Sequence, residues 1–186
     1  MRAVIFDFDG TLVDTMPIHF EAYRRVFSEM GLTLEPDDFF PNIGGKAPET
    51  IPKFLRGRRA SMSVSQIHAR KKELLDELLD TVEIRTLSSS ELIPWLSGWV
   101  PMAIASSGSR PGIDKILSRL GWTSSFQTVV TGEDVPNGKP APDLFLEAAR
   151  RLGIDASACF VFEDTDDGVE AARRAGMRVM DVRRAT

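Results

Sequence analysis

Apolar residues along the chain predict an alternation of short buried strands and longer amphipathic helices. The first run, residues 3–6 (Ala-Val-Ile-Phe), is short, uninterrupted and rich in branched and aromatic side chains, which is typical of a strand buried on both faces of a parallel sheet. Later apolar runs predict four more strands, at residues 102–105, 126–130, 159–162 and 178–182. Strands that alternate with helices in this way indicate an α/β fold with a Rossmann-like parallel sheet.

Between the later strands the apolar residues follow helical spacing. We expect three helices, each ended by a glycine, over residues 113–120, 143–152 and 167–175. Prolines precede the second of these helices and a glycine follows it, which matches the usual preference for proline at the start of a helix and glycine just past its end. A further helix is expected after Ser88, with the rings of Trp95 and Trp99 packed on the sheet.

The segment between the first two strands is different, because it contains helical patterns and no strand pattern. Helical spacing covers residues 15–30 and 63–81, the second with a capping box at its start, and a break rich in proline, acids and glycine separates them at 35–45. The sequence therefore predicts an α/β core with a small helical cap inserted after the first strand, with residues 1–14 and 85–186 in the core and 15–84 in the cap.

Composition narrows the class of protein. The 186 residues are 42% hydrophobic and 27% charged, which is ordinary for a soluble globular domain with an insertion. The net charge of −4 argues against a nucleic-acid partner, and no apolar stretch approaches the roughly 20 residues needed to span a bilayer. The single cysteine, Cys159, excludes an internal disulfide and is expected to be a small buried residue. We expect a cytoplasmic monomer without membrane contact.

Two acids follow the first strand directly. Asp7 and Asp9 are separated by one residue, and Gly10 lets the chain turn sharply after them. Carboxylates at the end of a buried strand are costly unless a cation meets them, and ligands of open α/β sheets bind at this end. A single acid would more often cap a turn, but a pair followed by Gly-Thr favours a metal site with a nucleophile or proton carrier.

Other polar residues lie at or just beyond the later strands. Ser106 and Ser107 follow the second strand, where a hydroxyl and backbone N–H groups can bind an anion. Lys139 lies between a glycine and a proline, so its backbone is stiff, and Glu163 and Asp164 follow the fourth strand. Because the carboxyl ends of parallel strands meet at one sheet edge, we expect these side chains to converge there.

The predicted cap contains a run of basic residues without any acid. Its members are Lys53, Arg56, Arg58, Arg59, Arg70, Lys71 and Lys72. Such a run usually marks a solvated helix face. Beside a phosphate site it can also attract an anionic substrate, and Lys71 or Lys72 are the residues for which we favour that role.

Four motifs in this chain resemble those of the haloacid dehalogenase superfamily of phosphotransferases. They are DFDGTLVDT at residues 7–15, the serine pair after the second strand, KPAPD beginning at Lys139 and EDxxxG beginning at Glu163. The resemblance covers the whole chain. The last two motifs have the form of the β-phosphoglucomutase-like branch and look most like bacterial fructose-1-phosphate-type sugar phosphatases. The resemblance implies a HAD-like core with a small helical cap at the position where the insertion is found.

The resemblance also implies roles for the acids. Asp7 would be the nucleophile that becomes an aspartyl phosphate, and Asp9 the general acid and base. Mg²⁺ would be the cofactor, with Asp7, Asp9 through its backbone carbonyl, Asp164, and Glu163 directly or through water as its ligands. Nearby there is no histidine or cysteine that would favour zinc.

Substrate-binding roles follow from the same resemblance. Ser106 and Ser107 would hold the phosphate, and Lys139 would neutralise the phosphoryl oxygens and the nucleophile. His19 matches a hinge histidine found in both mutases and related phosphatases. The loop around Lys46 lacks the arginine with which the mutase grips a second phosphate, and Lys46 is the residue that could replace it.

The function expected is a Mg²⁺-dependent phosphatase acting on a small phosphorylated sugar. The alternative is a β-phosphoglucomutase-type isomerase, which shares the core but must protect its phospho-enzyme from water. A signalling receiver domain uses similar residues, but a helical insertion after its first strand has no place in that design. A non-catalytic binding protein would be expected to have lost one of the four motifs.

Overall fold

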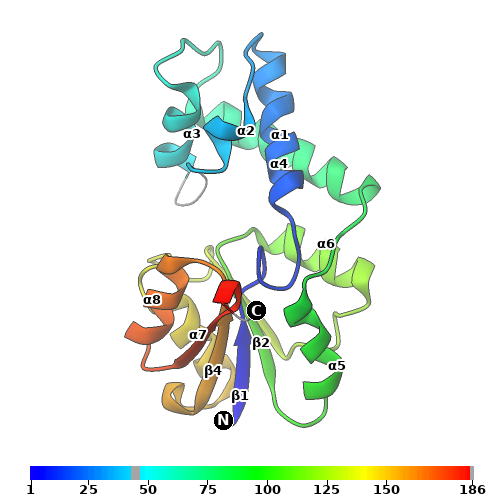
Figure 1. Cartoon of the computed structure of the whole chain (residues 1–186), viewed down its shortest axis with the longest axis vertical. Coiled ribbons are helices and arrows are strands. Elements are labelled where there is room, and N and C mark those ends of the chain that lie inside the picture. Colours follow the sequence, from blue (N-terminus) through cyan, green and yellow to red (C-terminus); the bar gives the residue numbers. More distant parts are fainter. Residues whose placement is uncertain (43–46, 185–186) are drawn as a thin grey trace. The chain divides into compact units, whose positions relative to one another are not determined.

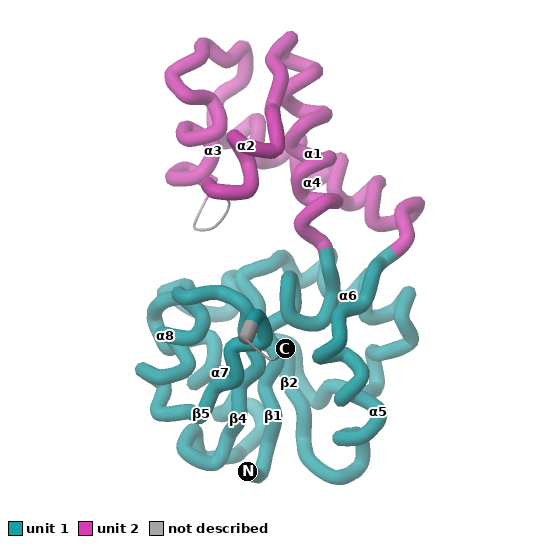
Figure 2. The backbone as a smooth tube through the Cα atoms, viewed as in Figure 1, with its two compact units in different colours: residues 1–14, 84–186 teal, residues 15–83 magenta. Residues whose placement is uncertain are grey.

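The computed structural model describes residues 1–42 and 47–184. The chain divides into two compact units, which Figure 2 draws in different colours. One consists of residues 1–14 and 84–186 and is called the sheet unit below. The other, residues 15–83, is called the helical unit.

Five parallel strands form the sheet unit's core, in the order β3-β2-β1-β4-β5 (Figure 1). The strands are β1 Ala3–Phe6, β2 Met102–Ser106, β3 Thr128–Thr131, β4 Cys159–Glu163 and β5 Arg178–Asp181. All residues of the central strand β1 are buried, and Phe6 has Ile104 of β2 and Phe162 of β4 as its partners. The predicted parallel α/β fold is confirmed, and these three strands end at the same sheet edge.

Helices lie on the two faces of this sheet. They are α5 Leu92–Leu96, α6 Arg110–Leu120, α7 Asp143–Leu152 and α8 Asp166–Arg174, with short 3₁₀ turns at Ser88–Glu91, Ala156–Ala158 and Val182–Arg184. Helices α7 and α8 cover one face, where Phe145 joins Ile5 and Val161 in one buried cluster with Cys159. Figure 1 shows α5 and α6 on the other side of the sheet. Cys159 is buried, as expected.

The helix predicted after Ser88 is shorter than expected, and its tryptophans do not pack on the sheet. Trp95 and Trp99 are 80% and 86% exposed, so that prediction is wrong. Ile93 is the residue of α5 that is buried. Trp95 stands two positions further on, about 200° around the helix, and therefore faces away from the sheet. Trp99 comes after α5 has ended at Leu96, so helical spacing no longer directs its ring.

The helical unit is built from four α-helices among the described residues. They are α1 Met16–Glu29, α2 Pro36–Phe39, α3 Ala47–Leu55 and α4 Val64–Thr81. Helix α1 packs along α4, and the rings of Tyr23, Phe39 and Phe54 contact one another with centroids 5.1–6.0 Å apart. The predicted capping box is present, with Ser63 as N-cap and Gln66 as its partner.

Two of these helices were not predicted. The break expected at 35–45 contains α2, which starts at Pro36 and has Asp37 and Asp38 in its first turn. Proline at this position and acids near the positive end of the helix dipole favour a helix start. Helix α3 is only 9 residues long and contains Pro52, so its apolar spacing is too brief to be read from the sequence.

The basic residues of the helical unit lie in different environments. Arg56 and Arg58 bind the buried carboxylate of Asp38, at 2.5 and 3.7 Å, and thus join α2 to the end of α3. Lys71 is only 7% exposed. The solvated interpretation fits Lys53, Arg59 and Lys72, which are exposed. The run is therefore partly structural.

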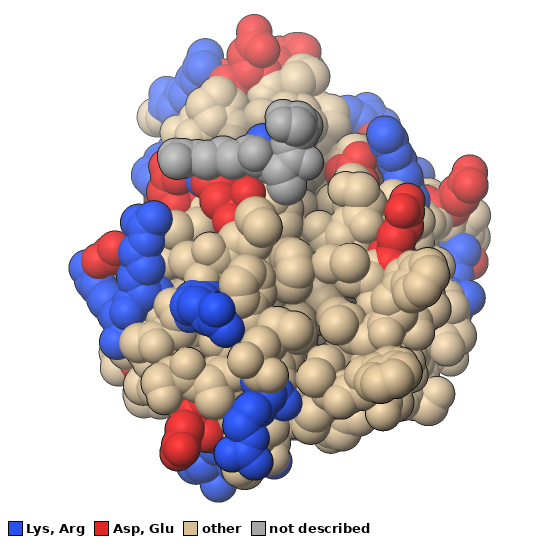
Figure 3. Space-filling view, turned by 60° about the horizontal axis from the view of Figure 1, so that its bottom comes forward, with Lys and Arg blue, Asp and Glu red and all other residues tan. Residues whose placement is uncertain are grey.

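On the face of the molecule drawn in Figure 3, Lys and Arg side chains stand in separate groups with Asp and Glu side chains near several of them, and a large part of the face bears neither. Among the described residues of that face, Lys and Arg do not merge into one broad basic field of the kind that nucleic-acid-binding proteins present. Within the described ranges, no helix combines the length and apolar character needed to cross a membrane.

Candidate active site

Strand ends bring the predicted residues of the sheet unit together. Asp7 follows β1, Ser106 ends β2 and Glu163 ends β4. Lys139 lies between β3 and α7, and its ammonium group hydrogen-bonds to Asp7 and, at 2.8 Å, to Oε1 of Glu163. Both carboxylates and the lysine side chain are at most 8% exposed. The lysine and the two acids therefore form a buried ionic cluster at the carboxyl edge of the sheet.

The charges in this cluster shift one another's protonation. Burial raises the pKa of Asp7 well above its ordinary value, the charge of Lys139 opposes that shift, and the carboxylates of Glu163 and Asp164 add to it. Burial by itself would lower the pKa of Lys139, but the adjacent Asp7 and Glu163 raise it above its ordinary value. We conclude that Lys139 is positively charged at neutral pH, whereas the ionised form of Asp7 needs cationic support.

Three of the acids can hold a metal ion. Asp7, Glu163 and Asp164 each offer a carboxylate oxygen, and these oxygens lie within 4.8 Å of one another. Burial, and after it the charge of Glu163, raises the pKa of Asp164. Against three carboxylates the cluster has one ammonium group, so negative charge remains in a place where it is costly. An all-oxygen donor set with excess negative charge fits a hard divalent cation.

Asp164 is held by two residues of the first motif. Thr11, which is fully buried, donates a hydrogen bond from Oγ1 to Oδ1 of Asp164 at 3.0 Å. Gly10 has φ +90°, and a Cβ at this position would lie 2.2 Å from Oδ2 of Asp164. Glycine is therefore required both for the turn and for room beside the carboxylate. The sequence analysis predicts no role for Thr11, although this residue directly follows Asp9 and Gly10.

Glu163 is held by the start of α8. It accepts hydrogen bonds from the backbone N of Thr165 at 2.5 Å and from Oγ1 of Thr165 at 3.0 Å. Thr165 is also the N-cap of α8, since its Oγ1 accepts from Gly168 N at 3.0 Å. Asp166 and Asp167 occupy the first turn of α8. The N-cap position of Thr165 before two acids is the signal that could have revealed its role.

Asp9 lies with Ser106 rather than in the lysine cluster. Oγ of Ser106 accepts a hydrogen bond from Gly108 N at 2.9 Å and donates one to Oδ2 of Asp9 at 3.4 Å. Ser106 is 1% exposed, whereas the following Ser107 is exposed. The serine turn after β2 thus lies beside the second aspartate of the first motif.

The predicted substrate-binding residues of the cap belong to the helical unit. Nδ1 of His19 lies 3.0 Å from Nζ of Lys71, and this ammonium group lies 5.3 Å from the centroid of the Tyr23 ring. The contact between Lys71 and His19 cannot be predicted from the sequence, because α1 and α4, which carry them, are far apart in the chain. Lys46 lies outside the described residues.

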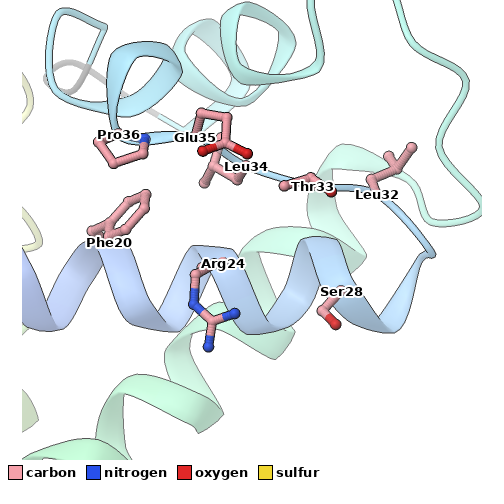
Figure 4. Close-up of a pocket in the computed structure, with 8 residues that line it drawn as sticks. All are labelled: Phe20, Arg24, Ser28, Leu32, Thr33, Leu34, Glu35 and Pro36. Atoms are coloured by element: carbon pink, nitrogen blue, oxygen red, sulfur yellow. The ribbon is translucent and has the colours of Figure 1, made fainter.

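The helical unit also contains a hollow of ≈ 300 Å³ between α1 and the segment that follows it (Figure 4). Its lining residues are Phe20, Arg24, Ser28, Leu32, Thr33, Leu34, Glu35 and Pro36. Arg24 is bound to Glu21 on its own helix at 2.6 Å. None of the predicted site residues that the structure describes lines this hollow, so we assign it no part in the chemistry described above.

The chain matches the family described as haloacid dehalogenase-like hydrolase over residues 4–182, and it belongs to this family. The expected superfamily, fold and enzyme class of hydrolase are thereby confirmed.

Named relatives agree with this assignment. The chain is 34% identical to fructose-1-phosphate phosphatase YqaB of Escherichia coli over 181 residues, covering 97% of this chain and 95% of that protein. It is 35% identical to a phosphorylated carbohydrates phosphatase of Thermotoga maritima, with 95% of this chain and 82% of the relative covered. Among solved structures, CbbY of Rhodobacter sphaeroides in complex with phosphate has a TM-score of 0.86 and 27% identity, covering 96% of this chain and 85% of that one.

Proposed function

We propose that this protein is a phosphatase that hydrolyses a small phosphorylated sugar, with Mg²⁺ as cofactor and an aspartyl phosphate on Asp7 as intermediate. The observation that carries the proposal is the buried contact of Lys139 with Asp7 and Glu163 in a cluster that keeps excess negative charge. Two relatives of this chain are named as phosphatases of fructose 1-phosphate and of phosphorylated carbohydrates, which supports the substrate class.

Two carboxyl groups would do the covalent and proton-transfer chemistry. In the first step an oxygen of Asp7 bonds to phosphorus while the ester P–O bond breaks, and Asp9 gives its proton to the departing sugar oxygen. In the second step Asp9 takes a proton from water, the water oxygen bonds to phosphorus, and the bond from phosphorus to Asp7 breaks. Inorganic phosphate leaves, and both carboxyl groups return to their initial protonation states.

Positive charge is needed because a carboxylate must approach an anionic phosphoryl group. Lys139 opposes the raised pKa of Asp7 and so favours the ionised nucleophile. Bound by Asp7, Asp164 and the backbone carbonyl of Asp9, Mg²⁺ would supply further charge against the phosphoryl oxygens. Glu163 already accepts hydrogen bonds from two neighbours, so we assign it the water-mediated role.

The remaining assignments concern substrate recognition. We assign the phosphoryl oxygens to Ser106 and to the backbone N–H groups around Ser107. The helical unit is proposed to act as the cap, with Lys46 and His19 among its substrate-binding residues. Because Lys71 binds His19 and is buried, we add it to that set. His19→Ala should raise KM for a sugar phosphate and leave KM for a small aryl phosphate within about twofold.

The test is a panel of sugar phosphates assayed for free phosphate and for isomer, with Mg²⁺ and after chelation. Wild-type protein should release phosphate only with the metal. Asp7→Asn keeps the size of the side chain but cannot attack phosphorus, so it should release none while its circular dichroism stays unchanged. Turnover by this variant near the wild-type rate would contradict the nucleophile assignment. Isomer formation without net phosphate release would favour the mutase instead.

A further inference from the structure

Lys139, which binds Asp7 and Glu163 in the buried ionic cluster, belongs to an irregular segment of the chain. Strand β3 ends at Thr131 and α7 begins at Asp143, and residues 132–142 connect them. Thr131 is the parallel partner of Ser106, so the segment starts beside the strand end that bears the proposed phosphate-binding serines. The position of Lys139 therefore depends on what fixes this connection.

The carboxylate of Asp134 fixes the start of the segment. Its Oδ2 accepts hydrogen bonds from the backbone N and from Oγ1 of Thr131, both at 2.8 Å, and its Oδ1 accepts one from Nη2 of Arg151 at 2.6 Å. Thr131 is 1% exposed, so these bonds reach into the buried end of the sheet. The hydrogen bond from Arg151 is the largest cause that lowers the pKa of Asp134 to about 2, and this carboxylate is therefore ionised at neutral pH.

Helix α7 holds residues 132–142 at two points. Arg151 lies at the carboxyl end of α7, where it also binds Glu147 at 2.7 Å. At the amino end of the same helix, Nδ2 of Asn137 donates a hydrogen bond to Asp143 at 3.0 Å. The segment is thus tied to a packed helix before and after the turn that leads to Lys139.

This bracing matters because the ammonium group of Lys139 meets carboxylates from two different strand ends. A shift of the segment by about 1 Å would exceed the tolerance of hydrogen-bond geometry. We propose that Asp134 is a positioning residue, whose carboxylate fixes residues 132–142 and thereby places the ammonium group of Lys139 between Asp7 and Glu163. The effect on catalysis rests on the proposed function, but the effect on Lys139 can be measured independently of turnover.

The first experiment measures the accessibility of Lys139 in the full-length protein. Asp134→Asn keeps the side-chain size but removes one acceptor oxygen and the charge. Glu147→Gln is the matched control, since it removes the other carboxylate bound to Arg151 and leaves the contacts between Asp134 and Thr131 in place. Acetic anhydride labels lysines, and peptide mass spectrometry compares Lys139 with the exposed Lys53 in each protein.

Lys139 should react slowly in the wild type and in Glu147→Gln. In Asp134→Asn it should react about tenfold faster, a factor equivalent to the loss of one hydrogen bond to a charged group. Unchanged labelling of Lys139 in Asp134→Asn with wild-type circular dichroism would overturn the inference. Should that variant not fold, Thr131→Val removes only the hydroxyl donor to Asp134, and labelling of Lys139 must still increase.

The second experiment measures turnover of a sugar phosphate. Asp134→Asn should lower kcat by about 10- to 100-fold, the range expected for a small misplacement of a reacting group, with KM within about twofold. In the Lys139→Ala background the same substitution should have no further effect, because the two residues act as a unit. An equal loss in both backgrounds would refute the inference. A wild type without phosphatase activity would contradict the proposed function, and the labelling result would still decide the role of Asp134.

Discussion

Gly168 stands in the first turn of α8, beside the buried carboxylate of Glu163. A Cβ at position 168 would lie 1.8 Å from Oε1 and 2.0 Å from Cδ of Glu163. These distances are far inside van der Waals contact, so Gly168→Ala can be accommodated only if the carboxylate moves. The substitution therefore tests whether Glu163 is fixed as the structure places it.

The cost can be worked out from the bonds that Glu163 would lose. It accepts hydrogen bonds from Lys139 at 2.8 Å and from the backbone N of Thr165 at 2.5 Å. Two hydrogen bonds to a charged group are worth about 3–6 kcal/mol, and alanine returns about 1 kcal/mol of helix propensity. The net loss in the free energy of unfolding is then about 2–5 kcal/mol, which for a chain of this size lowers Tm by about 4–20 °C.

Urea unfolding followed by far-UV circular dichroism measures this loss. Gly138→Ala is the matched control, because a Cβ at position 138 meets nothing within 4 Å and the change is chemically the same. It should alter the free energy of unfolding by no more than about 1 kcal/mol. If Gly168→Ala is as stable as the control, the carboxylate of Glu163 is not held where we describe it, and the reasoning fails.

Three further predictions concern metal, acid–base chemistry and pH. Asp164→Ala should abolish Mg²⁺-dependent turnover, as chelation should in the wild type; full activity after exhaustive chelation would count against a metal. Asp9→Asn should lose about 10²–10⁴-fold in turnover of a sugar phosphate. After rapid mixing with an aryl phosphate it should gain the mass of one phosphoryl group, and wild-type-like turnover would contradict its role. Because the pKa of Asp134 is lowered to about 2, wild type should be more stable than Asp134→Asn above pH 4 and lose that advantage as the pH falls towards 2 in urea titrations.

The parts of the fold that could be predicted are those in which burial and spacing agree. Strand β1 is buried along its whole length, and helix α7 begins and ends where proline and glycine place its limits. Prediction failed where an element is too short to repeat its pattern. Helix α2 is only four residues long, helix α3 contains Pro52, and the spacing of Trp95 and Trp99 continues past the end of α5.

The sequence predicts which residues of the candidate site lie near one another, but not which atoms they contact. Parallel strands end at one edge, so Asp7, Ser106 and Glu163 had to be neighbours once the strands were recognised. Which partners they contact depends on side-chain packing that spacing does not reveal. The bond from Ser106 to Asp9, and the contact between His19 and Lys71 across two helices, could be found only in the structure.

The two adjacent acids after β4 are held by the same local arrangement, used twice. Asp164 has Gly10 beside it and a hydrogen bond from Thr11, while Glu163 has Gly168 beside it and a hydrogen bond from a threonine hydroxyl. In each case the missing Cβ lets backbone approach the carboxylate closely, and the hydroxyl fixes its rotation. Neighbouring carboxylates repel each other, so they stay close only where packing restrains both. Because these restraints come from the chain itself, a divalent cation would meet ligands that are already in place.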